Sequence, residues 1–547
     1  MLLIKKQKYF ILFCLFIINL ILSTTSIIYS NKWYIYIVVL IMSSLLNSIS
    51  AILNLFYKMK NNDSMTNRIE PKNYIYVIPC YNESYEELYN TINSLVNQRV
   101  VPGDRRSIII ICDGNINTSN TLKKLLDINE NKLEKYEYTT WDNTSNIVET
   151  YNDYYYNNGI LIPYILIIKT INYGKRDSLV LARKLCYNYN TISKNYYVQD
   201  EIISNDMTLK INNIFKEIYK VTIEYIIGID ADTIFDYNCS YELINELYTD
   251  NKLYGCVGLV SISPQMKHYN LFILYQYAEY MYAQCLRRYT QAHLTNKVSC
   301  LSGCNQILRI TKETCGPEIL KQFNYLPEKN DNIFKYIRSY ASEDRNHVCH
   351  MLSMYPYVKT GQNIKAIAYT IVPTSISVFL SQRRRWSLGA NTNDILLVYL
   401  PGINIFERIA AFINCMTFML TPFIFISTIM FIHSIVTSPS YLMLYLGILV
   451  IIPIFYAVLI PIFINPLSFR TSMYFYISYL FFLVTGSIVG MCIYIYSMIN
   501  IDIIKWGKTR KIIIDMKNNN NDNNIDRYID DEIYISNTNS ILRFSLV

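Results

Sequence analysis

The sequence has few of the patterns that mark zinc-binding, disulfide-rich or nucleic-acid-binding proteins. Its 13 cysteines are odd in number and scattered, and no second pair completes a zinc site with Cys300 and Cys304. His347 and His350 form an HxxH that lacks a matching third ligand. The formal net charge is only +8 and no dense basic face is evident, so we expect no nucleic-acid partner. Free, reduced thiols are the expected state of the cysteines.

Polar residues are scarce inside the long apolar runs, which disfavours a transporter. Hydrophobic residues, in contrast, make up 52% of the 547 residues and gather near the two ends of the chain. Residues 9–30 and 34–57 are each long enough to cross a bilayer, which takes about 20 residues. The sequence therefore predicts a multi-pass membrane protein with a polar insert.

The lysines around the two N-terminal runs predict how they are oriented. Lysines precede the first run and follow the second, and a single one lies between them: Lys5, Lys6, Lys8, Lys58, Lys60 and Lys32. Because cytoplasmic flanks carry the excess of lysine and arginine, both outer ends and the insert are expected in the cytosol. No small-residue cleavage site precedes the second run, which disfavours a signal peptide. We expect residues 1–60 to form a transmembrane hairpin and 61–72 a linker.

Residues 73–400 are predicted to form an α/β domain with a mixed, mostly parallel sheet. Short β-rich runs alternate with helical patterns: strands at Tyr74–Pro79, Ser107–Cys112, Tyr164–Lys169 and Glu224–Ile229, and helices at Glu86–Val96 and Ser178–Cys186. In such folds the active site lies at the carboxyl ends of the strands. The Asn-rich stretches 115–120 and 188–213 are predicted to be loops.

Residues 401–510 return to membrane character, and the Asn-rich tail 511–547 is predicted to be disordered. An interfacial helix at Phe406–Asn414 is followed by candidate spans at Cys415–Val436, Tyr441–Asn465 and Met473–Asn500. If all three cross fully, Trp506–Arg510 would lie on the side opposite the insert. Either one segment is re-entrant or interfacial, or Trp506–Arg510 acts where a product leaves.

Two acidic motifs in the insert have the residue types that glycosyl transfer needs. Asp230 and Asp232 follow an apolar strand, and alternate residues of an extended segment point the same way. Their mutual repulsion is relieved by a hard cation, Mg²⁺ or Mn²⁺, that also bridges diphosphate oxygens. Asp344, between Glu343 and Arg345, offers a carboxylate that can take a proton from an incoming hydroxyl. Acidic residues in the first turn of a helix would look the same.

Other motifs combine polar and aromatic groups with strand ends. Gln382-Arg383-Arg384-Arg385-Trp386 offers an indole for a sugar face and guanidinium groups for phosphate, although basic runs before a span also set topology. Pro79–Glu83 and Asp113-Gly114 end two strands, where a nucleotide can meet backbone N–H groups. Gly174–Ser178 either caps a helix or places Lys175 near a diphosphate.

In this order, these motifs resemble chitin synthases among the processive family 2 glycosyltransferases. The resemblance covers residues 73–511 and rests on nine elements: Pro79–Glu83, Cys112–Gly114, Gly174–Ser178, Asp230–Asp232, Gln276 with Glu279 and Tyr280, Cys300–Cys304, Glu343–Arg345, Gln382–Trp386 and Trp506–Arg510. Ser302 stands where the family usually has proline, which puts the shape of that loop in doubt.

The resemblance implies a GT-A-type domain that transfers GlcNAc from UDP-GlcNAc, with inversion, to the 4-hydroxyl of a growing β-1,4 chain in the plasma membrane. It also implies membrane lipid and the nascent chitin chain as partners, and association as a homodimer. The implied donor contacts are Tyr81, Glu83, Asp113, Lys175 and Asp230, with Asp232 on the metal. Asp344 would be the base, and the acceptor and diphosphate would be held by Gly303, Cys304, Glu343, Arg345, Gln382, Arg384, Arg385 and Trp386. Trp506, Thr509 and Arg510 would gate the site or guide the polymer.

Rival interpretations stay open from the sequence alone. A hyaluronan- or cellulose-type synthase would share the layout, because sugar choice depends on pocket contacts that spacing does not reveal. A nodulation-type chitooligosaccharide synthase would differ mainly in product length. An inactive membrane scaffold is the alternative from another class, and the intact Asp230, Asp232, Asp344 and Trp386 argue against it.

Overall fold

The computed structural model describes residues 2–29, 42–60, 67–140, 144–193, 205–264, 266, 270–328, 330–437 and 441–503. All of them fall in one compact unit. The predicted disordered tail, 511–547, and the Trp506–Arg510 element lie outside the described residues.

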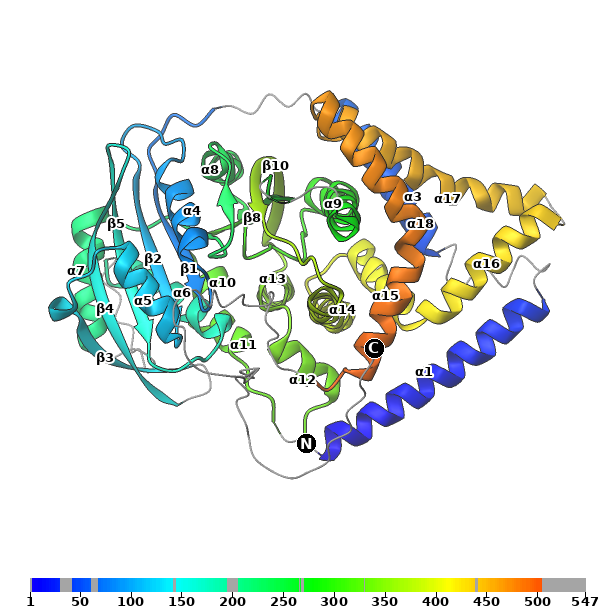
Figure 1. The fold of residues 1–547 in the computed structure, drawn as a ribbon, viewed down its shortest axis with the longest axis horizontal. Helices are drawn as coiled ribbons and strands as arrows, with labels where there is room; N and C mark the ends of the chain where they lie inside the picture. The colour runs from blue at the N-terminus through cyan, green and yellow to red at the C-terminus, as the bar shows by residue number, and fades with distance from the viewer. Residues whose placement is uncertain are drawn as a thin grey trace, which may run out of the picture. The chain divides into compact units, whose positions relative to one another are not determined.

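A ten-stranded mixed sheet forms the centre of the insert, in the order β3-β4-β5-β2-β1-β6-β9-β8-β10-β7 (Figure 1). The strands are β1 (Asn73–Cys80), β2 (Arg105–Asp113), β3 (Glu134–Thr139), β4 (Ser145–Asn157), β5 (Ile160–Lys169), β6 (Tyr225–Gly228), β7 (Ile234–Phe235), β8 (Leu253–Ile262), β9 (Gln306–Arg309) and β10 (Lys359–Thr370). The four central strands β5-β2-β1-β6 are parallel, and antiparallel partners flank them on both sides. These four are the four strands predicted from the sequence, and the mixed α/β class is confirmed.

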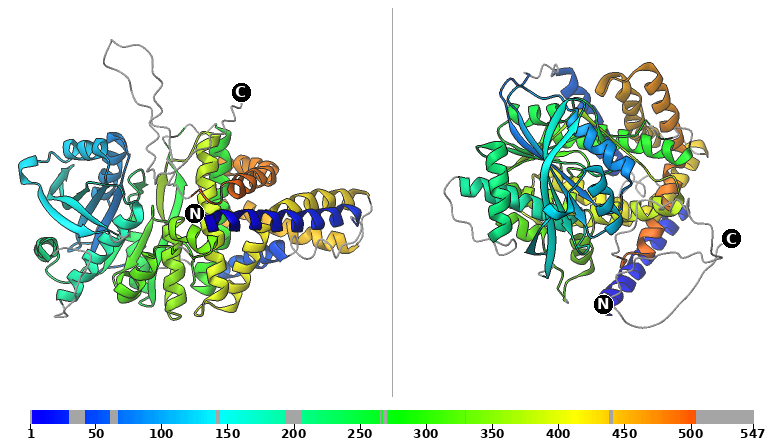
Figure 2. Two further views of the ribbon diagram at one scale, coloured as in Figure 1. Left: turned by 90° about the horizontal axis from the view of Figure 1, so that it is seen from below. Right: turned by 60° about the vertical axis from the view of Figure 1, so that its left-hand side comes forward.

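Helices cover both faces of the central strands (Figures 1 and 2). They are α4 (Tyr85–Val96), α5 (Ile116–Leu125), α6 (Lys175–Ser193), α7 (Asn205–Tyr219) and α8 (Cys239–Thr249). Alternate residues of β1 divide between two cores: Ile75 and Val77 pack with α6 and α7, whereas Tyr76 and Ile78 pack with α4 and α8. Strands buried on both faces in this way appear as continuous apolar runs in the sequence, which is why these four were predictable.

The two Asn-rich segments are mostly helical, so the prediction of loops there is wrong where the structure describes them. Asn115 is the N-cap of α5, and its side-chain oxygen accepts from the N–H groups of Asn117 and Thr118 at 2.9 and 3.2 Å. In α6, the Asn190 side chain exchanges two hydrogen bonds with the backbone of Ile223. Residues 194–204 lie outside the description. Asparagine here caps helices and bonds to the backbone, which composition alone does not distinguish from a loop.

A second group of helices lies between the sheet and the apolar helices. It comprises α9 (Leu271–Ala283), the π-helical segments η3 (Gln284–Arg288) and η4 (Gln291–Thr295), α10 (Lys312–Cys315), α11 (Pro317–Phe323), α12 (Ile333–Tyr340), α13 (Glu343–Met354) and α14 (Ile376–Tyr399). In the π-helical turn η3, two backbone carbonyl groups accept hydrogen bonds from side chains of two apolar helices. The Tyr456 hydroxyl donates to the Cys285 carbonyl at 2.5 Å, and the Asn54 amide donates to that of Leu286 at 3.0 Å.

The apolar helices are α1 (Leu2–Ile28), α3 (Met42–Lys60), α15 (Ile405–Met419), α16 (Thr421–Thr437), α17 (Tyr441–Leu459), continued by η5 (Ile460–Ile464), and α18 (Phe469–Ile499). In the described part of the chain, α1, the α17–η5 helix and α18 are long and apolar enough to cross a membrane. A fourth span results if α15 and α16 count as one bent crossing. The helix α3 covers residues 42–57 of the second predicted N-terminal span, and residues 34–41 of that span lie outside the description.

The bend of 83° between α15 and α16 is held by a side chain of α1. The Asn19 amide donates to the Met419 carbonyl at 3.1 Å, and its oxygen accepts the Phe423 N–H at 3.1 Å. Pro422, in the first turn of α16, has no N–H to continue the helical hydrogen bonds of α15. The predicted boundary between an interfacial helix and a span at Cys415 is therefore displaced, because α15 runs on to Met419.

Candidate active site

The loops after the central strands bring four predicted residues together around one amino group. Lys175, at the start of α6, places its Nζ 2.6 Å from Asp230, which follows β6. The same nitrogen lies 3.8 Å from Glu343 and 3.9 Å from Asp344, at the start of α13. Three motifs separated by more than 50 residues in the chain thus share one cation. Burial lowers the pKa of Lys175, but the three carboxylates outweigh it and raise that pKa well above its usual value.

Negative charge is in excess at this site, and it shows in the carboxyl pKa values. Burial raises the pKa of Asp232 to about 7, with Asp230 and Glu83 adding to the effect. Burial also raises the pKa of Asp344 to about 6, with Glu343 and Asp230 adding to it while Lys175 opposes it. A further cation is what such a cluster needs. No group of three or more His, Cys, Asp or Glu that could enclose a metal occurs among the described residues.

The donor set nevertheless fits a metal that binds together with a diphosphate. Mg²⁺ usually takes only one or two protein carboxylates and completes its shell with phosphate oxygens and water. Asp232, flanked by Asp230, supplies that number of carboxylates, and burial together with the charges of Asp230 and Glu83 raises its pKa.

Asp344 is held by one backbone group and has one oxygen to spare. The Gly303 N–H donates to its Oδ2 at 2.9 Å, whereas its Oδ1 is buried with no hydrogen-bond partner among the described residues. A β-carbon at Gly303 would lie 2.6 Å from Oδ2 and 2.7 Å from Oδ1. Glycine is therefore required for the backbone to come this close. Cys304, the next residue, is near the same carboxylates, and burial and these charges raise the pKa of its thiol well above its usual value.

The predicted nucleotide loop after β1 is closed by its own carboxylate. Glu83 accepts the N–H groups of Tyr81 and Asn82 at 2.7 and 3.0 Å, and its charge also acts on Asp232. Asp113 ends β2 and accepts the Tyr173 N–H at 3.2 Å. These interactions place the loops after β1, β2 and β5 beside each other, at the sheet edge expected from the parallel strands.

A buried lysine that the sequence reasoning missed joins two of the motifs. Lys169, the last residue of β5, donates its Nζ to Asp113 at 3.1 Å, to Asp177 at 2.5 Å and to Ser178 at 2.8 Å. Its side chain is fully buried. A lysine that ends an apolar strand, eight residues before an aspartate in the next helix, was the available signal. Lys169 therefore couples the loop after β2 to the first turn of α6, from which Lys175 projects.

Arg345 points away from this cluster. Its guanidinium pairs with Asp394 of α14 at 2.7 Å, and this pair fastens α13 to α14. Immediately before α13, Ser342 has a positive φ of 53°, and its side chain packs so closely on α14 that a β-carbon at Gly389 would lie 2.0 Å from its oxygen. Asp344 is thus positioned by α14 as well as by Gly303.

The Gln-Arg-Arg-Arg-Trp motif on α14 divides between different surroundings. The Arg383 guanidinium pairs with Glu279 of α9 and lies 4.4 Å from the centre of the Trp386 ring. Gln382 accepts from Arg383 at 2.7 Å. Trp386 is 42% exposed, so the indole is fixed from one side and open on the other. Arg383 was not among the predicted site residues.

The other two arginines differ in the charges they face. Burial lowers the pKa of both guanidinium groups. At Arg385 the charge of Glu343 opposes this lowering, whereas at Arg384 Tyr496 and Asp502, near the end of α18, oppose it. The end of α18 therefore lies beside α14. Ile503, the last described residue before Trp506–Arg510, lines a cavity with both arginines.

Comparison with known proteins identifies the family of this chain. A family model described as chitin synthase matches residues 48–540. The chain is 33% identical over 463 residues to chitin synthase 8 of Gibberella zeae, covering 81% of this chain and 67% of that protein. It is 31% identical over 437 residues to chitin synthase 8 of Verticillium dahliae, covering 72% and 70%.

Among solved structures, the chain is similar to the mannosyltransferase PcManGT from Pyrobaculum calidifontis, solved in complex with GDP-Man and Mn²⁺. The TM-score is 0.38 and the identity 10%, over 82% of this chain and 97% of that one, and no functional conclusion rests on it. The family match covers the sheet, the strand-end cluster and most of the apolar helices together. With its mixed α/β domain and its apolar helices, the chain belongs to the chitin synthase family.

Proposed function

We propose that this protein is an active chitin synthase, which transfers GlcNAc from UDP-GlcNAc to the 4-hydroxyl at the non-reducing end of a growing β-1,4 chain. The observation that carries the proposal is Asp344, a carboxylate with a raised pKa, one oxygen fixed by Gly303 and the other without a hydrogen-bond partner among the described residues. A general base needs this combination of a fixed position and an available lone pair.

The transfer is a single displacement with inversion. The acceptor 4-hydroxyl attacks C1 of GlcNAc from the face opposite the diphosphate and gives its proton to Oδ1 of Asp344. The bond from C1 to the diphosphate oxygen breaks, and UDP leaves with the electron pair. Lys175, held among Asp230, Glu343 and Asp344, lies where it can bind the departing diphosphate.

The donor is proposed to lie across the strand ends, with Tyr81, Glu83 and Asp113 at the uridine. Asp232, with Asp230, would hold Mg²⁺ or Mn²⁺, which neutralises the diphosphate charge as UDP departs. The carboxylates around Asp232 support this assignment, because burial and the charges of Asp230 and Glu83 raise its pKa, and a divalent ion would offset both.

The acceptor chain is proposed to stack its terminal sugar on the open face of Trp386 and to cross the membrane between the apolar helices. Gln382 and Arg385 flank this position on α14, with Gly303 and Cys304 opposite. The lysine distribution supports a catalytic domain in the cytosol. We also propose that the protein lies in the plasma membrane and associates as a homodimer. The course of α18 supports a place for Trp506–Arg510 on the catalytic side, because Ile503 lies beside Arg384 and Arg385.

The test is incorporation of radiolabelled GlcNAc from UDP-GlcNAc by the purified full-length protein in detergent, with Mg²⁺ or Mn²⁺, followed by chitinase. Insoluble, chitinase-sensitive product is the expected result. Incorporation from UDP-glucose instead, or only when UDP-glucuronate is added, would assign the protein to a cellulose- or hyaluronan-type activity. Soluble short oligomers would indicate a non-processive enzyme.

A further inference from the structure

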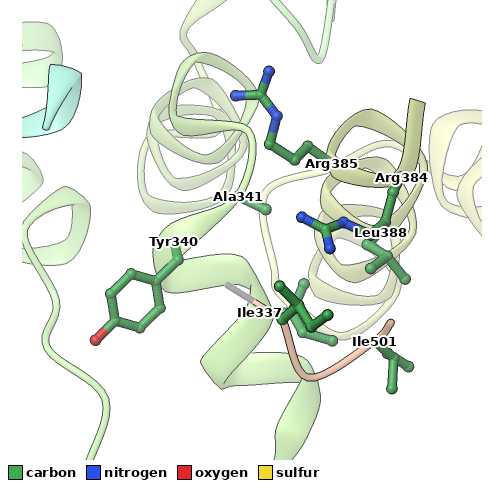
Figure 3. Close-up of a pocket in the computed structure, with 8 residues that line it drawn as sticks. Ile337, Tyr340, Ala341, Arg384, Arg385, Leu388 and Ile501 are labelled. Atoms are coloured by element: carbon green, nitrogen blue, oxygen red, sulfur yellow. The ribbon is translucent and has the colours of Figure 1, made fainter. Parts of the chain in front are cut away.

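A partly open cavity lies between α12, α14 and the end of α18 (Figure 3). Its walls are mostly apolar, with Ile337 from α12, Leu388 from α14, and Ile501 and Ile503 after α18. Arg384 directs its guanidinium into this space, whereas the Arg385 guanidinium is directed away from it. The cavity thus combines one cationic head with a hydrophobic surround.

Among the described residues, no carboxylate forms a direct ion pair with Arg384. Its side chain is buried, at 4% exposure, and no described carboxylate or carbonyl accepts a hydrogen bond from it. The charge of Asp502 acts on Arg384 only from a longer range, and the Asp502 carboxylate accepts from Lys8 of α1 at 2.6 Å. A buried guanidinium without a direct partner is destabilised, so a site of this kind favours an anion.

The position of the cavity favours an anion that carries an apolar part. One wall of the cavity is the end of α18. The helix α1 packs through Ile4, Leu12 and Leu15 against the apolar cluster that includes the cavity residues Ile337, Leu388 and Ile501. Both helices are apolar enough to span a membrane. The cavity therefore lies where two such helices end, which is where phospholipid headgroups lie. The donor-site cation, Lys175, is surrounded by a different set of carboxylates.

We infer that this cavity binds the phosphate of an anionic phospholipid at Arg384, with the start of an acyl chain against Ile337, Leu388 and Ile501. This departs from the expectation that Arg384 holds the donor diphosphate. It links the enzyme to the lipid composition of its membrane through α14, the helix that also carries Trp386. The inference goes beyond the proposed activity and can be tested without turnover.

The test measures lipid binding to the purified full-length protein. The protein is titrated with phosphatidylglycerol or phosphatidylcholine, and native mass spectrometry detects the bound lipid. A charge-assisted hydrogen bond to phosphate is worth about 1.5–3 kcal/mol, so the wild type is expected to prefer phosphatidylglycerol by about tenfold or more at one site. Arg384→Gln should remove the preference. Lys6→Gln, which removes an exposed charge near the start of α1, should retain it.

A second variant guards against a folding defect. Ile501→Trp fills the cavity and leaves Arg384 in place, so it should weaken phosphatidylglycerol binding while the melting temperature stays near that of the wild type. Equal binding of the two lipids by the wild type, or an unchanged preference in both variants, would overturn the inference. So would displacement of the lipid by UDP or by inorganic phosphate, which would assign the cavity to the donor or to a free anion. None of these outcomes depends on whether GlcNAc is incorporated.

Discussion

Gly303 and Asp344 are in contact at a distance that no other residue at position 303 allows. The backbone N–H of Gly303 donates to Oδ2 of Asp344 at 2.9 Å, and a β-carbon there would lie 2.6 Å from that oxygen. The proposed base is therefore positioned by the absence of a side chain on the neighbouring loop.

Gly303→Ala should lower the rate of GlcNAc transfer without unfolding the protein. The added methyl group has to displace the Asp344 carboxylate, and a displacement of about 1 Å at a reacting group can cost about 100-fold. Initial rates of incorporation measure the effect. Gly486→Ala is the matched control, because a β-carbon there meets nothing within 4 Å. Equal rates for the two variants would contradict the positioning role.

Asp344→Asn should abolish transfer and leave UDP-GlcNAc binding intact, because an amide cannot take the proton. In the wild type the pKa of about 6 predicts the acidic limb of the pH profile. The carboxylate is the active form, so kcat/KM should be level above about pH 7 and fall about tenfold per pH unit well below pH 6. A pH series of kcat/KM, with UDP-GlcNAc binding measured by calorimetry, checks both. Substantial transfer by the variant would exclude Asp344 as the base.

Removal of divalent metal should stop turnover, and Asp232→Asn should raise the metal concentration needed for half-maximal rate. The reason is the group of carboxylates around Asp232, whose charge a divalent cation would offset while it also binds the donor diphosphate. Titration of chelated enzyme with Mn²⁺ and Mg²⁺ gives the measurement. Asp250→Asn, at an exposed ion pair with Lys359, serves as the control. Synthesis that persists after chelation would refute the metal role.

Lys169→Met should destabilise the domain and weaken donor binding. It leaves Asp113 and Asp177 buried without their shared cation, and breaking a buried pair in this way costs about 3–5 kcal/mol. We expect a lower melting temperature and a raised KM for UDP-GlcNAc. Lys210→Met removes an exposed pair with Glu134, worth about 0–1 kcal/mol. If both lysine variants melt alike, Lys169 does not support the two motifs as described.

Arg383→Lys should shorten the polymer more than it affects the donor. Lysine can still pair with Glu279, but it lacks the flat guanidinium that lies over Trp386. A looser indole should release the acceptor sooner, so the product length falls while the KM for UDP-GlcNAc changes less than about twofold. Chromatography of chitinase-trimmed and intact product measures the length. Arg309→Lys, whose contact with the Tyr225 ring spans 5.4 Å, controls for the loss of an arginine.

The central strands and the strand-end residues were accessible from the sequence because local patterns specify them. Strands β1, β2, β5 and β6 are continuous apolar runs, and a polar motif follows each. The strands β8, β9 and β10 were not predicted: β9 has only four residues, and β8 contains two glycines. Their place in the sheet depends on pairing with distant strands.

The roles of individual charged residues were harder to predict than their presence. Nothing in the sequence around Arg345 indicates that it pairs with Asp394, 49 residues further along the chain. Likewise, the three arginines of one motif are consecutive in the sequence yet face three different surroundings, because successive helical residues project about 100° apart. Spacing can bring the motif to the site, but packing decides which of its side chains faces the carboxylates.

The hydrogen bonds of Asn19 to the break between α15 and α16 have a consequence for how the chain is made. Asn19 and Phe423 are 404 residues apart, so at about 5–20 residues per second the ribosome needs on the order of tens of seconds to supply the partner. Until then the amide has only the Leu15 carbonyl of its own helix, at 2.8 Å. The hydrogen bonds of Asn19 that hold the bend can therefore form only after the insert and α15 have been synthesised.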